Sequence, residues 1–585
     1  MNIETKICQN CEQSFVIEPE DFTFYEKIKV PPPTWCPECR AIRRMVFWNQ
    51  SNLYRKKDSR TGEEIFSTYP ARADVKIYDH DYWWSDAWDP MEFGMAIDFS
   101  RPFLEQLKEL NAKVPLPSRS VRGMVNSDYS NQASYLKDCY PCFNGGNAEN
   151  CLYCVAFQRI KDTMDAYAVL DLELGYELYQ AGSSSRCFFS SDVENCRDVW
   201  FSRDCVDCSD CFGCVNLRHK RYCIFNEQCT KEDYEKNVKA LDRGSHAAVQ
   251  DIKKKLRELY LRLPHKFLHG LHNVNVSGDY VYNSKNAHDV FEAGELEDVR
   301  YSENLATGVK DAYDYTNWGE HSELIYEASS CGDNCRNIKF CFDCWPAMRD
   351  SEYCLSCHSS GNLFGCVGLR NKQYCILNKQ YTREEYEELL PRIIDHMTAM
   401  PYTNQNGRTY RYGEFFPPEF SPLAYNETIA INYYPKAKDA VMASGYLWRD
   451  PDEKEYEATM GASDLPDHIS DAKDSIIEQV IRCDSCKRAH RILDRELAFY
   501  RRFVIPLPRL CHRCRYTARL SIRNPRKSYR RRCECAGKSS ENGIYQNTIA
   551  HFHKSDPCPN EFETSYAPGR SEIVYCEQCY NAEVV

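Results

Sequence analysis

The feature that most limits what this chain can fold into is a pattern of four cysteines that occurs twice. Two Cys-x2-Cys pairs, separated by 24 residues, lie near the start of the chain and recur near its end, shifted by a constant 475 positions. Phe24-Tyr25 and Arg40 recur in the same register as Phe499-Tyr500 and Arg515. A register kept without a gap predicts two copies of one small domain.

This spacing is typical of structural zinc sites. Zn²⁺ prefers a tetrahedron of thiolate or imidazole ligands, and a Cys-x2-Cys turn supplies two of them. Two reduced surface hairpins would leave the shared spacing unexplained. We therefore predict one zinc ion in each copy, with ligands Cys8, Cys11, Cys36 and Cys39 in the first and Cys483, Cys486, Cys511 and Cys514 in the second.

A third zinc site is predicted at the C-terminus. Cys576-x2-Cys579 forms another such pair, and Cys535 and Cys558 are the expected partners. The sequence leaves the choice open, because other thiol and imidazole groups compete for the same ion, namely Cys533, His551 and His553. The expected cofactor is thus Zn²⁺, with two to three ions per chain.

The cysteine content also bears on the compartment. The chain holds 33 cysteines in 585 residues, whereas disulfide scaffolds are typical of small secreted domains. The first residues, Met1 to Lys6, do not resemble a signal peptide. No window reaches the roughly 18–20 apolar residues of a membrane-spanning helix. We predict a cytoplasmic protein with reduced thiols and no membrane partner.

A second duplication occupies the middle of the chain, with an offset of 152. Phe212-Gly213-Cys214-Val215 recurs as Phe364-Gly365-Cys366-Val367, and each copy runs into a helix-like segment that starts near Thr230 or Thr382. Cysteines recur every nine residues from Cys187 to Cys223. Short pieces with an Asn or Asp turn and alternating β-type residues surround them. We predict that two such pieces form one coil of a parallel β-solenoid.

The cysteines inside these repeats allow two interpretations. Pairs such as Cys139-x2-Cys142 and Cys341-x2-Cys344 have the spacing of metal ligands or iron–sulfur ligands. They also follow the repeat, and free cysteine is among the most buried residue types, so a ladder of thiols without metal is the favoured alternative.

The predicted fold is multi-domain and mainly β, with two treble-clef or zinc-ribbon fingers and a C-terminal zinc module flanking two parallel β-solenoid blocks with helical caps. The expected ranges are 1–70 for finger 1, 71–125 for a linker region, 126–270 for block 1, 276–400 for block 2, 401–480 for an aromatic and proline-rich connector, 481–532 for finger 2 with a basic tail, and 533–585 for the C-terminal module.

Charge is distributed unevenly along the chain. The net charge is −12, but residues 483–532 carry 16 basic and 3 acidic residues, or +13, which leaves −25 for the rest. A basic helix is expected after the second cysteine pair of each finger. A basic helix can contact phosphates, so we predict RNA or DNA contacts by Arg40, Arg43, Arg44, Arg515, Arg519, Arg530, Arg531 and Arg532. The alternative is that these arginines pair with the acidic remainder of the chain.

The two ends of the chain resemble the bacterial "probable zinc-ribbon" family. The matching features are Cys-x2-Cys, a Phe-Tyr pair before a proline-bearing turn, and Cys-Pro-Glu-Cys-Arg or Cys-His-Arg-Cys-Arg, over about 40 residues at each end. The whole chain, including 412–418 and 563–568, resembles large cysteine-rich proteins of candidate-phyla bacteria. The resemblance implies zinc binding in the cytosol and implies no activity.

Besides thiol redox chemistry through the Cys-x2-Cys pairs, which zinc occupancy would block, three functions remain open at this stage. The first is a zinc-stabilised scaffold that binds RNA or DNA, possibly ribosome-associated. The second is a scaffold for a protein partner on the solenoid faces. The third is a carbohydrate-active enzyme, for which Trp318, Glu320, His321 and Glu323 form the nearest cluster, although neighbouring strand positions face opposite ways. No nucleotide-binding loop or nucleophile elbow stands out, so we name no catalytic residue.

Overall fold

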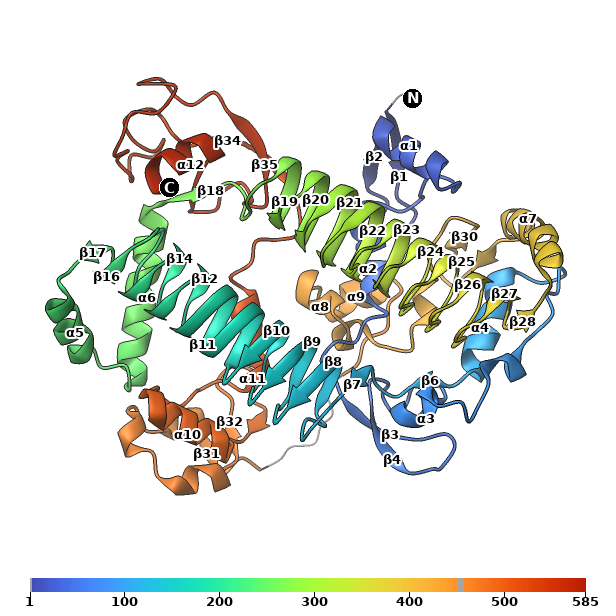
Figure 1. Ribbon diagram of the computed structural model, residues 1–585, viewed down its shortest axis with the longest axis horizontal. Coiled ribbons are helices and arrows are strands. Elements are labelled where there is room, and N and C mark those ends of the chain that lie inside the picture. The colour runs from blue at the N-terminus through green and yellow to red at the C-terminus, as the bar shows by residue number, and fades with distance from the viewer. Residues whose placement is uncertain (1–2, 451–456) are drawn as a thin grey trace.

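The computed structural model describes residues 3–450 and 457–585. The described chain is mainly β, with two large parallel sheets and several cysteine clusters. Figure 1 shows the two sheets as long stacks of short strands, with small cysteine-rich modules placed against their sides. We call the sheet within 121–228 the first stack and the sheet within 274–380 the second stack.

The first stack contains eleven strands that follow one another along the chain. They are β7 (Val121–Arg122), β8 (Ser130–Lys137), β9 (Cys142–Glu149), β10 (Val155–Lys161), β11 (Met164–Phe188), β12 (Ser191–Glu194), β13 (Arg197–Trp200), β14 (Arg203–Val206), β15 (Ser209–Phe212), β16 (Arg221–Ile224) and β17 (Glu227–Gln228). All pairings are parallel except the last, between β16 and β17.

The second stack contains ten strands in the same kind of succession. They are β19 (Val274–Tyr282), β20 (Lys285–Gly294), β21 (Leu296–Leu305), β22 (Val309–Trp318), β23 (Glu323–Cys331), β24 (Arg336–Lys339), β25 (Arg349–Glu352), β26 (Gly361–Phe364), β27 (Gln373–Ile376) and β28 (Lys379–Gln380). It also ends on an antiparallel hairpin, between β27 and β28.

The repeat in both stacks differs from the expected one. In the first stack, Ser130 lies opposite Cys142, a step of twelve residues. In the second, Leu296 lies opposite Val309, a step of thirteen. Within each step one residue in three points inward, as for the buried residues Cys139, Cys142, Ala148, Cys151 and Cys154.

Left-handed backbone explains this period of three. Positive φ angles recur at Asn147, Asn150 and Tyr153, each one position before an inward residue, namely Ala148, Cys151 and Cys154. Asn adopts this conformation more readily than most residues. The expected two-residue alternation was therefore wrong. Cysteine recurs every nine residues because nine is three of these three-residue periods. The offset between residues that lie opposite each other on neighbouring strands is twelve or thirteen residues.

Helices close the C-terminal end of each stack. The first stack is followed by α5 (Lys231–Ala240) and α6 (His246–Arg262), the second by α7 (Arg383–Ala399). Thr230 and Thr382 cap α5 and α7, because each hydroxyl accepts a hydrogen bond from the backbone N–H three residues on. The strand β18 (Pro264–Lys266) then leads from the first stack toward the second.

The two fingers have the same local order of elements. The first contains the hairpin β1 (Glu4–Ile7) and β2 (Ser14–Ile17), followed by α1 (Pro19–Lys27) and α2 (Pro37–Met45). The second contains the hairpin β32 (Ile481–Arg482) and β33 (Ala489–His490), followed by α10 (Asp494–Phe503) and α11 (His512–Leu520). In each, one cysteine pair lies in the hairpin turn and the other at the start of the last helix.

The segment expected to be a linker, 71–125, is folded against the second stack. The preceding hairpin is β3 (Tyr54–Lys57) with β4 (Glu64–Ser67), and the segment itself holds β5 (Ile77–Tyr78), α3 (His80–Trp84), η1 (Pro90–Phe93), α4 (Phe103–Lys113) and β6 (Leu116–Pro117). Phe103 and Leu107 are buried in one cluster with Phe364 and Ile376 of the last strands. Its proline turns are therefore compatible with a packed segment.

The connector, 401–480, also contributes to cores. Its elements are β29 (Tyr402–Thr403), β30 (Thr409–Tyr410), η2 (Pro418–Phe420), η3 (Tyr425–Glu427), α8 (Ala430–Tyr433), α9 (Lys438–Ala443), β31 (Met460–Gly461), η4 (Ala462–Asp464), η5 (Ile469–Asp471) and η6 (Asp474–Glu478). Phe415 and Phe416 are buried with the first finger, whereas Ile469 and Ile476 are buried with the second.

The C-terminal module contains β34 (Tyr529–Arg532), β35 (Glu561–Thr564), β36 (Ile573–Tyr575) and α12 (Glu577–Val584). It is joined to the rest of the molecule by the parallel pairing of β36 with β18, between the two stacks. In Figure 1 it lies beside β18 and β19.

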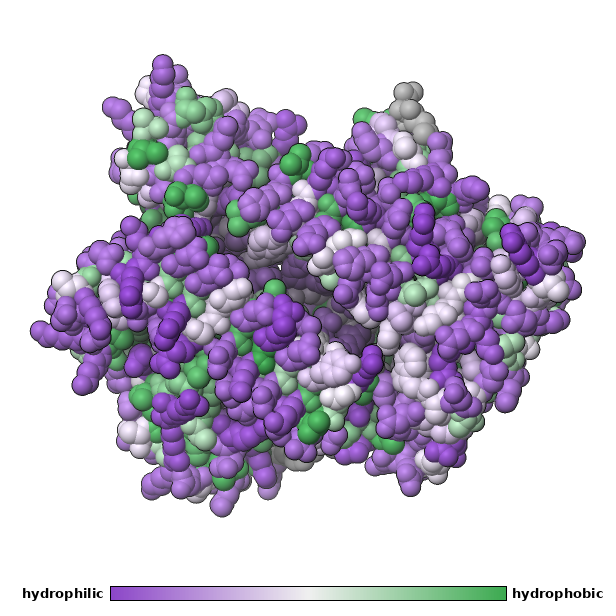
Figure 2. All heavy atoms as spheres, viewed as in Figure 1, coloured by the Kyte–Doolittle hydropathy of each residue, from purple (hydrophilic) through white to green (hydrophobic). Residues whose placement is uncertain are grey.

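Each finger packs on the stack that is remote from it in the chain. The helix α2 of the first finger lies against β21, β22 and β23 of the second stack, and α11 of the second finger lies against β11 of the first stack (Figure 1). The first finger therefore packs on the second stack, and the second finger packs on the first stack. The visible surface is mostly hydrophilic (Figure 2), and none of the described helices is long and apolar enough to cross a membrane.

Candidate metal centres

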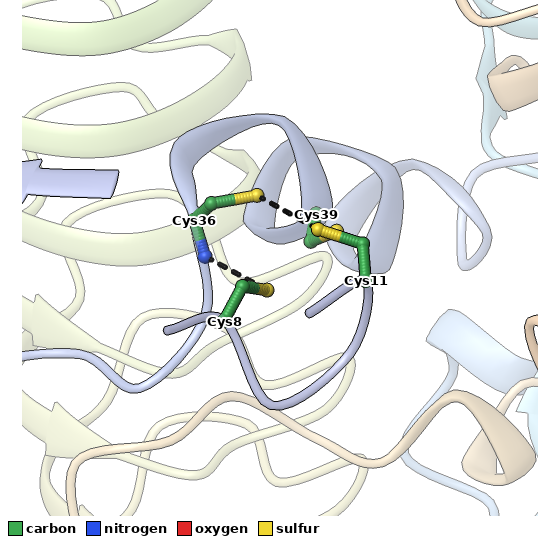
Figure 3. Close-up of side chains that lie close together, drawn as sticks. All are labelled: Cys8, Cys11, Cys36 and Cys39. Atoms are coloured by element: carbon green, nitrogen blue, oxygen red, sulfur yellow. Dashed lines mark hydrogen bonds between the residues drawn. The ribbon is translucent and has the colours of Figure 1, made fainter. Parts of the chain in front are cut away.

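The four predicted cysteines of the first finger come together. Cys8 and Cys11 lie in the β1–β2 turn, and Cys36 is the N-cap of α2, with Cys39 in its first turn. Their sulfur atoms converge (Figure 3) and lie within 4.8 Å of one another. The Sγ atoms of Cys11 and Cys36 are 3.8 Å apart, and the backbone N–H of Cys36 donates to Cys8 Sγ at 3.2 Å.

The second finger repeats this arrangement. Its four predicted cysteines also lie within 4.8 Å, with Cys511 as the N-cap of α11. The Sγ atoms of Cys486 and Cys511 are 3.7 Å apart, and the N–H of Cys511 donates to Cys483 Sγ at 3.2 Å. Burial alone would raise the pKa of Cys483, but the N–H groups of Cys511, Cys486 and Ser485 outweigh it and lower that pKa to about 7.

These distances fit metal ligation. All cysteines are free thiols, and the sulfur separations are far longer than a disulfide bond of about 2.05 Å. A regular tetrahedron with metal–sulfur bonds of about 2.3 Å has edges of about 3.8 Å. Backbone N–H groups at a helix N-terminus also stabilise thiolates. Both sets can therefore hold a metal ion, and the choice of ion is taken up below.

The C-terminal module corrects the predicted third ligand set. Cys558, Cys576 and Cys579 are grouped with Cys533, and the expected fourth ligand, Cys535, is not in this group. The N–H of Cys576 donates to Cys533 Sγ at 3.2 Å, as the helix N-terminus does in each finger.

Cys535 belongs to a second group in the same module. It lies within 4.8 Å of His551, His553 and Cys579. Its Sγ is 3.0 Å from His551 Nδ1, and His553 Nε2 is 3.3 Å from Cys579 Sγ. Cys579 is thus common to both groups. Cys533, His551 and His553, which the sequence left as competing ligands, all belong to one of the two groups.

The cysteines inside the stacks form a ladder of thiols. They are fully buried, and their Sγ–H groups donate to backbone carbonyls, as Cys154 does to Leu152 at 3.4 Å and Cys139 does to Ala148 at 3.6 Å. Burial raises the pKa of Cys187 and Cys335 to about 12. Within residues 3–450 and 457–585, no stack cysteine belongs to a group with metal-site spacing, which favours the ladder.

The arginines of the first finger are not on its surface. Arg40, Arg43 and Arg44 are at most 1% exposed. Their ion pairs are Arg40 to Asp314 at 2.9 Å, Arg43 to Glu327 at 2.6 Å and Glu414 at 2.7 Å, and Arg44 to Asp314 at 3.1 Å, Glu327 at 3.4 Å and Glu303 at 3.6 Å. Burial raises the pKa of Glu303 and of Glu327.

The second finger uses two arginines in the same way. Arg515 pairs with Asp165 at 2.8 Å and with Glu496 at 3.5 Å, and Arg519 pairs with Asp165 at 2.9 Å. Asp165 is completely buried in β11. The prediction of nucleic-acid contacts is thus corrected for the five helix arginines. Their guanidinium groups neutralise buried carboxylates and cannot reach a phosphate outside the fold.

The basic tail lies on β34 and is only partly exposed. Arg530 pairs with Glu561 at 2.6 Å, Arg532 pairs with Glu541, and Arg531 is mostly buried beside Glu534. The side chains of Arg530 and Arg532 are 80% and 68% exposed. These two are the predicted nucleic-acid residues whose charges remain accessible, each next to a glutamate.

Two further clusters are weaker candidates. Asp192, Asp204 and His269 have metal-site spacing, but Arg203 lies 3.3 Å from Asp192 and already supplies a cation. Trp318 donates from its ring N–H to Glu320 at 3.1 Å, beside a turn where Glu320 and His321 are exposed. Neither arrangement adds a catalytic residue to those considered from the sequence.

Comparison with known proteins gives no family. No family model matches the chain, and no curated protein matches its sequence. Among solved structures, a Desulfovibrio desulfuricans G20 protein described as an acetyltransferase aligns with 50% of this chain and 77% of its own length, at 8% identity and a TM-score of 0.11. A TM-score this low does not indicate a common fold, and nothing about function follows from it.

Proposed function

We propose that this protein is a zinc-held scaffold in which two treble-clef fingers each clamp one of two parallel β-solenoids. Zinc is the ion we assign, because closed all-cysteine sites with CxxC turns are typical structural zinc sites and leave no open position for a substrate. The regular twelve- and thirteen-residue steps of parallel strands support the solenoid assignment.

One observation carries this proposal, namely that both fingers dock with the same bonds in the same register. Arg40 donates to the carbonyl of Trp35 at 2.7 Å and pairs with the strand residue Asp314. At the positions shifted by 475, Arg515 donates to the carbonyl of Leu510 at 3.0 Å and pairs with Asp165. Repetition of both bonds supports a docking mode that is built into each finger.

Aromatic contacts repeat in the same way. Tyr25 packs edge-on against Tyr326 with ring centroids 5.5 Å apart, and Tyr500 packs edge-on against Tyr176 at 5.8 Å. Such aromatic pairs are each worth about 0.5–1.5 kcal/mol beyond their buried area. The finger therefore supplies both a polar and an apolar contact to its stack.

Metal binding and docking are coupled in this scheme. Cys36 and Cys39 fix the start of α2, Arg40 follows Cys39 directly and Arg43 lies about one helical turn further on, so the metal sets the direction of the arginines. In small domains of this kind the free energy of zinc binding is the free energy of folding. Without the ion, a disordered helix would leave buried strand carboxylates unpaired, at a cost of about 3–5 kcal/mol for each broken pair.

A protein partner suits this scaffold better than a nucleic acid. The net charge is −12, and five of the eight arginines predicted to bind phosphate are used inside the fold. Nucleic-acid binding through Arg530 and Arg532 stays a prediction. Salt-dependent RNA binding by the wild type that disappears in an R530E/R532E variant would support it over a protein partner.

Hydrogen exchange resolved by mass spectrometry tests the clamp on the full chain. Cys39→Ser should increase exchange in 309–331 of the second stack and leave 164–188 of the first stack protected. Cys514→Ser should do the reverse. Cys229→Ser, at a half-buried cysteine outside every cluster, is the matched control. Loss of one zinc ion without a change in the facing stack would contradict the proposal.

A further inference from the structure

The C-terminal module brings together more ligands than one metal ion can use. Five thiols and two imidazoles form two overlapping groups of four, and Cys579 belongs to both. A single four-coordinate ion in the first group would leave Cys535, His551 and His553 with no role. We propose that this module holds a binuclear centre of two divalent zinc-type ions, bridged by the thiolate of Cys579.

The distances around Cys579 support a bridge. Its Sγ lies 3.7 Å from Cys558 Sγ in the first group and 3.3 Å from His553 Nε2 in the second. Cys558 and Cys576 are 3.8 Å apart, close to the edge of about 3.8 Å for a tetrahedral zinc–thiolate site. Cys579 lies in the first turn of α12, three residues after the N-cap Cys576, and is fully buried.

Both histidines are oriented as metal ligands are. Metal-bound imidazoles donate their second N–H to a carboxylate or a carbonyl, which fixes the ring and the tautomer. His551 directs Nδ1 to Cys535 and places Nε2 2.7 Å from the carboxylate of Glu583. His553 directs Nε2 to Cys579 and places Nδ1 2.6 Å from the carbonyl of Asp556. The side chains of His551 and Glu583 are completely buried.

The thiols receive hydrogen bonds that suit thiolates. Asn547 donates from Nδ2 to Cys535 Sγ at 3.1 Å, and Asn560 donates from Nδ2 to Cys576 Sγ at 3.3 Å. Five thiolates with two divalent ions leave a formal charge of 4 − 5 = −1, which these donors stabilise. One ion bound by the four thiolates of the first group, with Cys535 as a neutral thiol, would leave 2 − 4 = −2, a larger charge to bury.

The centre is structural in this interpretation. Each ion has four protein ligands and no open position, so neither activates a water molecule. The second ion ties the segment 535–553 to α12, where His551 and Tyr545 both contact Glu583. This segment contains one of the longest stretches with little regular secondary structure among the described residues, and cross-linking by metal replaces a hydrophobic core. The inference does not depend on the role of the two fingers.

Cadmium NMR and metal counting on the full chain test the proposal. With ¹¹³Cd in place of zinc, we expect four resonances, of which two are split by mutual coupling through the bridging sulfur. In the zinc protein, Cys558→Ser and His553→Ala should each remove one ion, and the double variant should remove two. His272→Ala, which removes an exposed imidazole outside every cluster, should remove none.

A mononuclear module gives different results. It would show three cadmium resonances without a coupled pair, and His553→Ala would either keep the full metal content or remove the same ion as Cys558→Ser. Either result overturns the proposal. The wild-type spectrum decides even if a variant fails to fold, and the uncoupled resonances report on the fingers separately.

Discussion

The two finger–stack units share one ion pair, Arg40 with Asp314 in the first and Arg515 with Asp165 in the second, which we call the latch. They differ in how deeply the finger is enclosed. In the first unit every residue of α2 from Cys39 to Met45 is buried, whereas in α11 the buried residues are Arg515, Arg519 and Leu520. The connector contributes to this enclosure, because its residues Phe415 and Phe416 are buried in one cluster with Ile42 and Met45 of α2. The two units have the arginine–aspartate latch in common, so we infer that this latch is what docking requires.

One aligned position shows the difference most clearly. Arg43 is completely buried between Glu327 of the second stack and Glu414 of the connector. The residue shifted by 475 positions is Ala518, which is exposed. The first unit thus sets three arginines against four carboxylates, and the second sets two arginines against two. The first unit therefore has one more buried carboxylate than arginines, whereas the second has equal numbers of the two.

This balance predicts which latch is harder to break. Asp165→Ala leaves Arg515 and Arg519 facing Glu496 alone, and a guanidinium cannot lose its proton, so we expect the second unit to lose about 3–5 kcal/mol. Asp314→Ala leaves three arginines facing three carboxylates, and we expect a smaller loss, about 1–3 kcal/mol. Native-state hydrogen exchange of α11 and α2 at saturating zinc measures both.

Asp171→Ala is the control for this pair. Asp171 lies on β11, as Asp165 does, but its side chain is 41% exposed and pairs with Arg159. It should change the exchange of α11 by less than about 0.5 kcal/mol. A larger effect of Asp314→Ala than of Asp165→Ala would show that charge balance does not govern the latches.

The second prediction exchanges the aligned residues. Arg43→Ala should destabilise the first unit by about 2–4 kcal/mol, because Glu327 and Glu414 lose a buried partner, although a carboxyl can take up a proton to limit the cost. Ala518→Arg should stay within about 0.5 kcal/mol of wild type, because the new side chain reaches solvent. Equal effects on the exchange of α2 and α11 would argue against the connector as the cause of the difference.

The sequence predicted which four cysteines come together in each finger, because their spacing is local chemistry. It could not predict the destination of the arginines. A basic helix after a cysteine pair has the same pattern whether it faces phosphate or a buried carboxylate, and Asp314 and Asp165 lie more than 250 residues from their partners in the chain. The crossed docking of fingers on stacks is likewise invisible in the order of segments.

The stacks show a different limit. The two-residue alternation expected of strands hid the period of three, although the Asn and Asp residues at positions such as 144, 147 and 150 recur at that period. In the C-terminal module, the pairs Cys533-x-Cys535 and His551-x-His553 were a usable signal. Seven candidate ligands exceed the four of one zinc ion, and this excess indicates a second ligand group.

The last prediction concerns pH and the excess carboxylate of the first unit. Burial raises the pKa of Glu303 in the folded state, against the attraction of Arg44 and Arg526. Between about pH 4.5, the ordinary pKa of a glutamate, and this raised pKa, the folded state therefore binds more of a proton at Glu303 than the unfolded chain does. This contribution to stability is present below about pH 4.5 and is lost as the pH rises through the raised pKa.

Glu303→Gln removes this titration and keeps the shape of the side chain. Between pH 5 and pH 7 the variant should gain stability relative to wild type as the pH rises, by about 1.4 kcal/mol for each unit of pKa shift. Thermal unfolding at saturating zinc measures this difference. Acid also releases zinc from the thiolates, but this effect is common to both proteins and cancels in the comparison. The opposite result would be a wild type whose stability rises relative to that of the variant as the pH rises. It would mean that Arg44 holds Glu303 as a carboxylate, so that the first unit, like the second, has no carboxylate in excess.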